Sequence, residues 1–338
     1  MDTTRRIMVV AALLAACGGC ALVTSSSEGT TGAGGGPSTT SGGGASPAGS
    51  LFCQHSASVV NPAGMTSTVS MTCTDTSRVL TANGIPDHAT GAFPNAGNPN
   101  TIRAQTVSFS APRNPAKLAT TTAVRESGCA LNGIKLEPGT AESYQNAGVW
   151  RIEALGQTYF KFGVDQNNAH VQPTGAYHYH GMPEGYMDRL GKGTAMTLVA
   201  FAADGFPVYA RYGFDKAADA ASALRPMVPS YRMKAEPAAG RPATSAVAMG
   251  TFTQDYEYVE GLGDLDDCNG RTGVTPEFPA GIYHYYITDG YPYIQRCVKG
   301  TAASAGGPPG GGPPGGGPPP RDGGPPPMDG GPPGPPPP

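Results

Sequence analysis

The sequence predicts a mainly β fold, sandwich-like or α+β, built as a single domain with long ordered loops. Two observations predict it. Short apolar segments recur between clusters of Gly, Pro and Asn, and few stretches carry the 3.6-residue periodicity of an amphipathic helix. Of the 338 residues, 50 are Gly and 35 are Pro, and these concentrate near the two ends. Residues 52–300 therefore keep an ordinary globular composition, enough for one large domain or two small ones.

Strands are expected where side chains alternate between polar and apolar, or where an apolar run lies between turn residues. These segments are residues 69–73, 105–109, 149–153, 159–162 and, as a buried central strand, 197–202. Helix is expected in only two places. Residues 215–224 form an Ala-rich candidate that ends before Pro226, and residues 140–146 have room for one helical turn.

Residues 1–16 have the pattern of a signal peptide, in which Arg5 and Arg6 precede an apolar run too short to span a bilayer as a stable helix. The run ends in Leu-Ala-Ala before Cys17, which resembles the lipobox of bacterial lipoproteins. This resemblance implies cleavage before Cys17, its acylation, and the membrane as a partner through the N-terminal lipid. Ordinary secretion is the alternative.

No Asp follows Cys17 to suggest retention at the inner membrane. We therefore expect a lipid anchor at the bacterial outer membrane or cell surface, with a secreted or periplasmic protein as the alternative. Residues 17–51 continue from the lipidated Cys as a flexible Ser/Thr/Gly-rich linker. Residues 301–338 form a Gly/Pro-rich tail expected to be disordered.

Two classes of protein are excluded by composition. The formal net charge of −3 leaves no basic patch to neutralise phosphates, so nucleic acid is not an expected partner. After residue 23 no apolar run approaches the ~20 residues that a bilayer requires, which excludes a multi-pass membrane protein.

The predicted domain contains five cysteines, and export would place them where disulfides persist. Pairing the other four cysteines as described below leaves Cys129, which is then either buried as a free thiol or bonded to Cys20. Spacing alone does not settle connectivity. Two disulfides are expected from position, one around the last motif segment and one at the start of the domain: Cys268–Cys297 and Cys53–Cys73.

The candidate chemistry concentrates in residues 177–180 (Tyr-His-Tyr-His) and 283–286 (Tyr-His-Tyr-Tyr). Side chains alternate faces along a strand, so His178 and His180 point to one side, about 7 Å apart. Neutral imidazole nitrogens suit zinc and copper, and two at this spacing can converge on one ion. If the two strands are neighbours, His284 supplies the third nitrogen.

His88 and Asp204 are the candidates to complete this metal set, whereas His55 and His170 have loop positions without special context. A structural network is the alternative interpretation of the Tyr-His alternation. In that case the strand has an aromatic face and a His face that is hydrogen-bonded to backbone carbonyls or carboxylates.

An acidic loop near residue 266 is a candidate calcium site, because oxygen-rich turns can hold that ion. Its spacing departs from that of an EF-hand, and an acidic turn that satisfies its own backbone is the alternative. The candidate ligands are Asp264, Asp266, Asp267 and Asn269.

Residues 177–180 and 204–209, together with 264–271 and 283–297, resemble the YHYH domain family of exported bacterial proteins. Residues 83–100 and 131–142 are similar to its N-terminal and middle motifs, so the resemblance covers about residues 78–300 in order. One departure is that the second segment lacks a second histidine, which argues against a symmetrical four-His site. The resemblance supports a domain at residues 52–300 and one shared site, but it implies no particular chemistry.

The sequence thus favours a membrane-anchored exported lipoprotein with a His-based site that binds a transition metal, zinc or copper. One alternative is a metal-dependent hydrolase or oxidoreductase that uses the same site, with Asp204 or Asp289 as base and a Tyr as proton donor. Another is a surface module whose Tyr-rich face binds saccharide or protein. Familiar hydrolase and nucleotide-binding motifs are absent, so whether the protein is an enzyme stays open.

Overall fold

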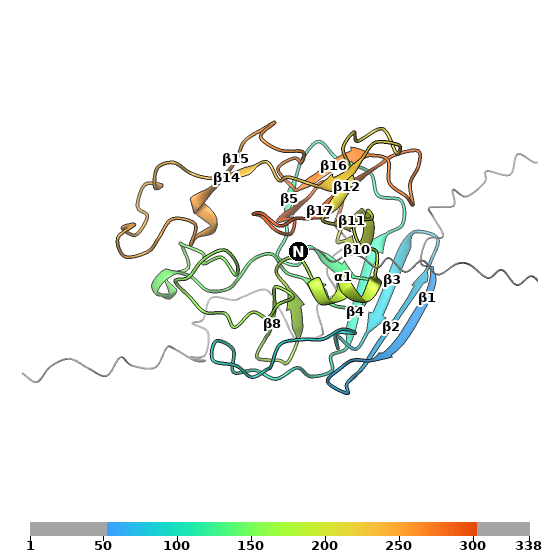
Figure 1. Cartoon of the computed structure of the whole chain (residues 1–338), viewed down its shortest axis with the longest axis horizontal. Helices are drawn as coiled ribbons and strands as arrows, with labels where there is room; N and C mark the ends of the chain where they lie inside the picture. Colours follow the sequence, from blue (N-terminus) through green and yellow to red (C-terminus); the bar gives the residue numbers. More distant parts are fainter. Residues whose placement is uncertain (1–52, 303–338) are drawn as a thin grey trace, which may run out of the picture. The chain divides into compact units, whose positions relative to one another are not determined.

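The computed structural model of the protein describes residues 53–302 (Figure 1). The expected signal peptide, Cys17, Cys20, the linker and nearly all of the Gly/Pro-rich tail lie outside these residues. The described residues form a mainly β structure with several sheets, as the sequence predicts. No helix in this range combines the length and apolar character that crossing a bilayer demands.

A four-stranded antiparallel sheet opens the described chain, with its strands adjacent in chain order (Figure 1). Polar and apolar residues alternate along β2, so that Val69 and Met71 are buried while Thr68 and Thr72 face solvent. The sheet therefore has one packed face and one wet face. Its strands are β1 (Gln54–Val60), β2 (Thr66–Cys73), β3 (Ser77–Ala82) and β4 (Val107–Pro112).

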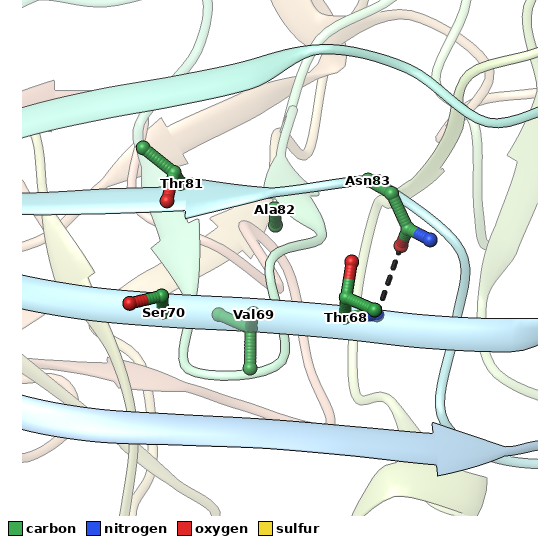
Figure 2. A pocket seen from close by; sticks show the side chains of 6 residues that line it. All are labelled: Thr68, Val69, Ser70, Thr81, Ala82 and Asn83. Atoms are coloured by element: carbon green, nitrogen blue, oxygen red, sulfur yellow. Dashed lines mark hydrogen bonds between the residues drawn. The ribbon is translucent and has the colours of Figure 1, made fainter.

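A shallow hollow lies on this sheet at β2 and β3 (Figure 2). Asn83 Oδ1 accepts a hydrogen bond of 3.1 Å from the backbone N–H of Thr68 at its edge. The lining side chains include no charged group and no histidine, so the hollow is separate from the candidate His chemistry. They are Thr68, Val69, Ser70, Thr81, Ala82 and Asn83.

The larger sheet has eight strands in the spatial order β16-β17-β11-β10-β6-β7-β9-β8. The ladders β11–β17 and β7–β9 are parallel and the others are antiparallel. Four strands separate β9 from β17, the strands that carry the two Tyr-His segments. The strands are β16 (Gly270–Gly273), β17 (Ile282–Ile287), β11 (Pro207–Ala210), β10 (Thr197–Ala202), β6 (Gly128–Ala130), β7 (Lys135–Leu136), β9 (Tyr177–Tyr179) and β8 (Ala169–Val171).

The two faces of the larger sheet bury two apolar clusters. All six residues of β10 are buried, which confirms the predicted central strand at residues 197–202. Leu198 and Phe201 pack in the cluster that includes Val69 and Met71 of the smaller sheet. Val199 lies in the other cluster, which includes side chains of β9, β17 and α1. The core thus fixes β10 between the two motif strands.

The remaining elements are short and connect or flank the sheets. Three strand pairs are β12 (Tyr212–Phe214) with β13 (Leu224–Pro226), β14 (Tyr231–Met233) with β15 (Tyr256–Tyr258), and β18 (Cys297–Val298) with β5 (Thr122–Ala123). The helices are α1 (Glu184–Leu190) and the 3-10 turns η2 (Tyr144–Asn146) and η3 (Thr253–Asp255). The turn η2 falls within the expected helical turn at residues 140–146.

Three expected elements are wrong. Residues 149–153 form only isolated bridges and residues 159–162 form no strand, because Gln157 Oε1 accepts from the N–H of Phe160 and folds that segment into a turn. Residues 215–224 contain no helix. There the Asp219 carboxylate accepts from the N–H of Ala221, and Ser222 donates to the carbonyl of Asp219. Such side-chain bonds compete with helix and outweigh the propensity of Ala.

Both predicted disulfides are present. Cys53–Cys73 joins the residue before β1 to the end of β2, and Cys268–Cys297 ties the acidic loop to β18. Cys129 is buried as a free thiol, and burial raises its pKa to about 12. This thiol is therefore protonated and unreactive at neutral pH.

The double variant Cys268→Ser/Cys297→Ser should lose about 3–4 kcal/mol of unfolding free energy, because the disulfide closes a loop with a sequence separation of 29. Urea unfolding under non-reducing conditions measures this loss. Cys129→Ser is the control for removing a thiol outside either disulfide. If the double variant has the same unfolding free energy as the wild type, the prediction is wrong.

Candidate metal centre

Three histidines meet on one face at the end of the eight-stranded sheet. The antiparallel register of β8 and β9 places His170 directly opposite His178. His180 lies two residues beyond His178, so the alternation of an extended chain puts it on the same face. The turn between the strands is made by Gly175, whose φ of 90° suits glycine and whose N–H donates to the carbonyl of Gln172 at 2.8 Å.

The three imidazoles are close enough to share one ion. The ring centroids are 4.6 Å apart for His170–His178, 4.8 Å for His170–His180 and 4.6 Å for His178–His180. One nitrogen from each ring lies within 4.8 Å of the other two. Nε2 of His170 and Nε2 of His180 are 3.1 Å apart. Tetrahedral ligands with zinc–nitrogen bonds of ~2.0–2.1 Å are about 3.4 Å from one another, so this pair is already near that separation.

Backbone carbonyls fix the tautomers of two of the rings. A carbonyl oxygen can only accept, so Nδ1 of His170 carries a proton and donates to Phe162 O at 2.9 Å. Nδ1 of His178 makes a longer contact of 3.4 Å with Ala176 O. Both arrangements leave Nε2 with its lone pair free, which is how metal-binding histidines are commonly oriented. Without an ion, Nε2–H of His180 is then the donor to His170.

The surroundings keep all three imidazoles neutral. Burial lowers the pKa of His178 well below its ordinary range, and neighbouring His180 and His170 lower it further. The pKa of His180 is also lowered well below that range, first by burial and then by His170 and Arg296. Burial likewise lowers the pKa of His170. Neutral imidazole is the form that binds metal, so these groups are ready to act as ligands at pH 7.

The tyrosines of the same motif point to the opposite face of the sheet. Tyr177 donates to Oδ2 of Asp165 at 2.7 Å, and Tyr179 OH is 2.6 Å from His88 Nε2. Tyr179 also accepts from Asn132 at 2.9 Å. His88 therefore belongs to a hydrogen-bond network behind β9 and does not join the three histidines, contrary to the expected role.

The structure does not bring His284 to the cluster either. It lies on β17, five inter-strand steps from β9, or roughly 24 Å at the usual spacing of ~4.8 Å. Its Nε2 contacts Tyr286 OH at 2.9 Å, its Nδ1 donates to Ile282 O at 2.9 Å, and burial lowers its pKa to about 4. The expectation that the two motif strands are neighbours is wrong, and His284 fits the alternative interpretation of a structural network.

The two predicted acid-base candidates also lie elsewhere. Asp204 is buried in the turn after β10, where it accepts from Tyr285 OH at 2.7 Å and from the N–H of Gly300 at 2.8 Å. Burial raises its pKa. Asp289 follows β17 and pairs with Arg211 at 2.9 Å near the surface. Neither carboxylate is part of the three-histidine cluster.

The acidic side chains of the loop near residue 266 all have partners within the folded protein. Asp264 accepts two hydrogen bonds from Arg225, at 2.6 and 2.7 Å, and Asp266 Oδ1 accepts from the N–H of Cys268 at 3.0 Å. Asp267 pairs with Lys299, and Asn269 Nδ2 donates to a carbonyl of β17. Calcium is not needed to explain this loop, which fits the alternative of a turn satisfied by its own backbone and by nearby cations.

His170 is the functional candidate that sequence reasoning missed. A local signal was present, because Ala169 and Val171 flank it in an alternating pattern and Gly175 offers a turn before Tyr177. The missed inference was that these residues form a hairpin. Once that hairpin is recognised, the register places His170 beside His178.

Residues 108–300 match the family model described as YHYH protein. This match spans more than half of the chain, and the chain therefore belongs to the YHYH family. The letters of that description spell residues 177–180, the Tyr-His-Tyr-His segment that contributes two of the three clustered imidazoles. The match also includes His170, but it leaves out β1, β2 and β3. No curated protein and no solved structure shows significant similarity to the chain.

Acidification should destabilise the metal-free protein. In the unfolded chain each histidine takes up a proton near its ordinary pKa of about 6.5, whereas in the folded protein the depressed pKa values of His170, His178 and His180 keep them neutral. The unfolded state therefore binds more protons below pH 6.5, and the unfolding free energy falls by up to about 1.4 kcal/mol per histidine per pH unit.

Urea unfolding of the metal-free protein at intervals between pH 7.5 and 5.5 measures this slope. The variant His178→Gln should show a shallower pH dependence than the wild type, because it removes one of the depressed pKa values. An unfolding free energy of the wild type that does not change across this range would contradict the pKa assignments.

Proposed function

We propose that this YHYH-family protein binds one transition-metal ion, zinc or copper, through His170, His178 and His180. The observation that carries the proposal is the convergence of three imidazoles, one ligand atom each, within 4.8 Å on a single hairpin. Zinc and copper are among the ions that neutral imidazole suits, together with iron and nickel.

Burial and orientation support this function over a packing role. His178 and His180 are 1% and 2% exposed, and Nδ1 of His180 is buried without a hydrogen-bond partner. A bound ion would give all three rings one shared interaction in place of the single contact between His170 and His180. The carbonyls of Phe162 and Ala176 already orient two of the rings for it.

Catalysis at the same site is the second candidate. Three protein ligands with a fourth position open are typical of catalytic zinc sites, whereas structural sites close with four. His170 is only partly buried and provides the side from which a fourth ligand can approach. A metal-dependent hydrolase or oxidoreductase is the activity class that this arrangement would serve.

Tag-free wild-type protein, stripped with a chelator and then loaded, should retain about one zinc or copper ion per chain by elemental analysis. His170→Ala and His178→Ala should each lose most of this uptake, because two imidazoles hold an ion far less tightly than three. His55→Ala and His284→Gln are matched controls that should retain it. Wild-type protein that takes up neither ion after loading would rule out the proposed function.

We also propose that the protein is exported and anchored by lipid at Cys17, at the outer membrane or cell surface. The two disulfides of the folded domain support an oxidising compartment, since such bonds are rare in the reducing cytosol. The lipobox-like residues before Cys17 support acylation. Multiple acyl chains would then hold the protein stably on the membrane.

In a bacterial host, wild-type protein should partition into the detergent phase of a Triton X-114 separation. The variant Cys17→Ser should move to the aqueous phase, because it lacks the thiol that carries the lipid. Cys20→Ser is the matched control and should partition like the wild type. Equal partitioning of wild type and Cys17→Ser would contradict the anchor.

A further inference from the structure

A buried carboxylate stands next to the three histidines. Strand β7 pairs in parallel with β9 so that Lys135 lies opposite His178, and Glu137 follows two residues later on the same face. The backbone N–H of Glu137 donates to Tyr179 O at 3.0 Å, which holds this residue beside the motif strand. Its Oε2 is 3.9 Å from His178 Nε2. In the described part of the chain, no other carboxylate pairs with a nitrogen of the cluster.

Other groups hold Glu137 in the metal-free protein. Its Oε2 lies 2.7 Å from Lys135 Nζ and accepts from Gln172 Nε2 at 3.0 Å, while Oε1 is 3.3 Å from Arg125 Nε. Glu137 is 3% exposed, whereas the side chains of Arg125 and Lys135 extend toward solvent. Arg125 and Lys135 thus compensate the buried negative charge of Glu137. Both side chains can turn toward solvent and release it.

A divalent ion held by three neutral imidazoles would place two positive charges in this buried site. Burying uncompensated charge is costly, and a carboxylate within reach reduces that cost. The gap between Glu137 Oε2 and His178 Nε2 exceeds the separation of tetrahedral zinc ligands by only about 0.5 Å. A small rotation that releases Lys135 would therefore bring Oε2 to the ion.

We infer that Glu137 is the fourth, charge-balancing group of the metal site and makes it selective for divalent ions over Cu(I). This inference rests on the proposed metal binding, and because Glu137 would fill the fourth position it disfavours the catalytic candidate. Cu(I) is a soft ion with a single charge, and a small number of neutral ligands is enough to bind it. A carboxylate is a hard ligand and binds more strongly to an ion of higher charge, such as Zn²⁺. Lys135 competes with the ion for Oε2. A stronger Lys135–Glu137 ion pair therefore lowers the affinity of the site for the metal ion.

The test compares Zn²⁺ and Cu(I) affinities of the full chain, each measured by competition with a chromophoric chelator, the latter without oxygen. Glu137→Gln keeps the shape of the side chain but removes its charge. It should weaken Zn²⁺ binding by about 10- to 100-fold and change Cu(I) binding by less than about threefold. Lys135→Met should tighten Zn²⁺ binding by at least about threefold, because Oε2 loses its competing ammonium, and should tighten Cu(I) binding by a smaller factor.

Zn²⁺ affinity within about threefold of the wild type in Glu137→Gln, or an equal loss for both ions, would overturn the inference. If Glu137→Gln fails to fold, unchanged Zn²⁺ affinity in Lys135→Met would overturn it instead. These results differ from failure of the proposed function, in which the wild type itself binds neither ion. Circular dichroism and intact disulfides establish that each variant keeps the fold.

Discussion

The architecture of the site depends on the alternation of side chains along β9. Tyr177 and Tyr179 face one side, where hydrogen bonds of Tyr177 to Asp165 and of Tyr179 to both His88 and Asn132 fix the strand against the core. His178 therefore has to face the other side, toward β8 and the open end of the sheet. The tyrosines hold the strand in register, and the register in turn sets the distance between the imidazoles.

The second motif segment uses the same alternation with a different outcome. Tyr283 and Tyr285 on β17 donate to Asp266 and Asp204 behind the sheet, as Tyr177 on β9 donates to Asp165. However, β17 lies between β16 and β11 in the sheet, and on the other face the His284 ring is hydrogen-bonded to Tyr286. An edge hairpin supplies His170 to one motif, while no neighbouring strand supplies a histidine to the other. The position of the strand in the sheet thus determines whether its histidine, like His178, belongs to a candidate metal centre or, like His284, to a structural network.

Much of this fold could be predicted from the sequence, because local patterns determine it. The apolar run at residues 197–202, the disulfide partners and the shared face of His178 and His180 follow from composition, position and strand periodicity. Strand order could not be predicted, since it is set by long-range packing that leaves no local trace. The sequence alone therefore favours His284 as a neighbour of His178, and the position of Glu137 beside His178 follows only from the register. The hairpin that brings His170 to His178 does have a local signal, the turn at Gly175.

The most direct test of the central claim is an anomalous difference map at the zinc edge from crystals of the zinc-loaded protein. The account predicts one peak per chain, about 2.0–2.1 Å from nitrogens of His170, His178 and His180. A fully loaded crystal with its peak at His284 or at the acidic loop, and none among these three imidazoles, would contradict it.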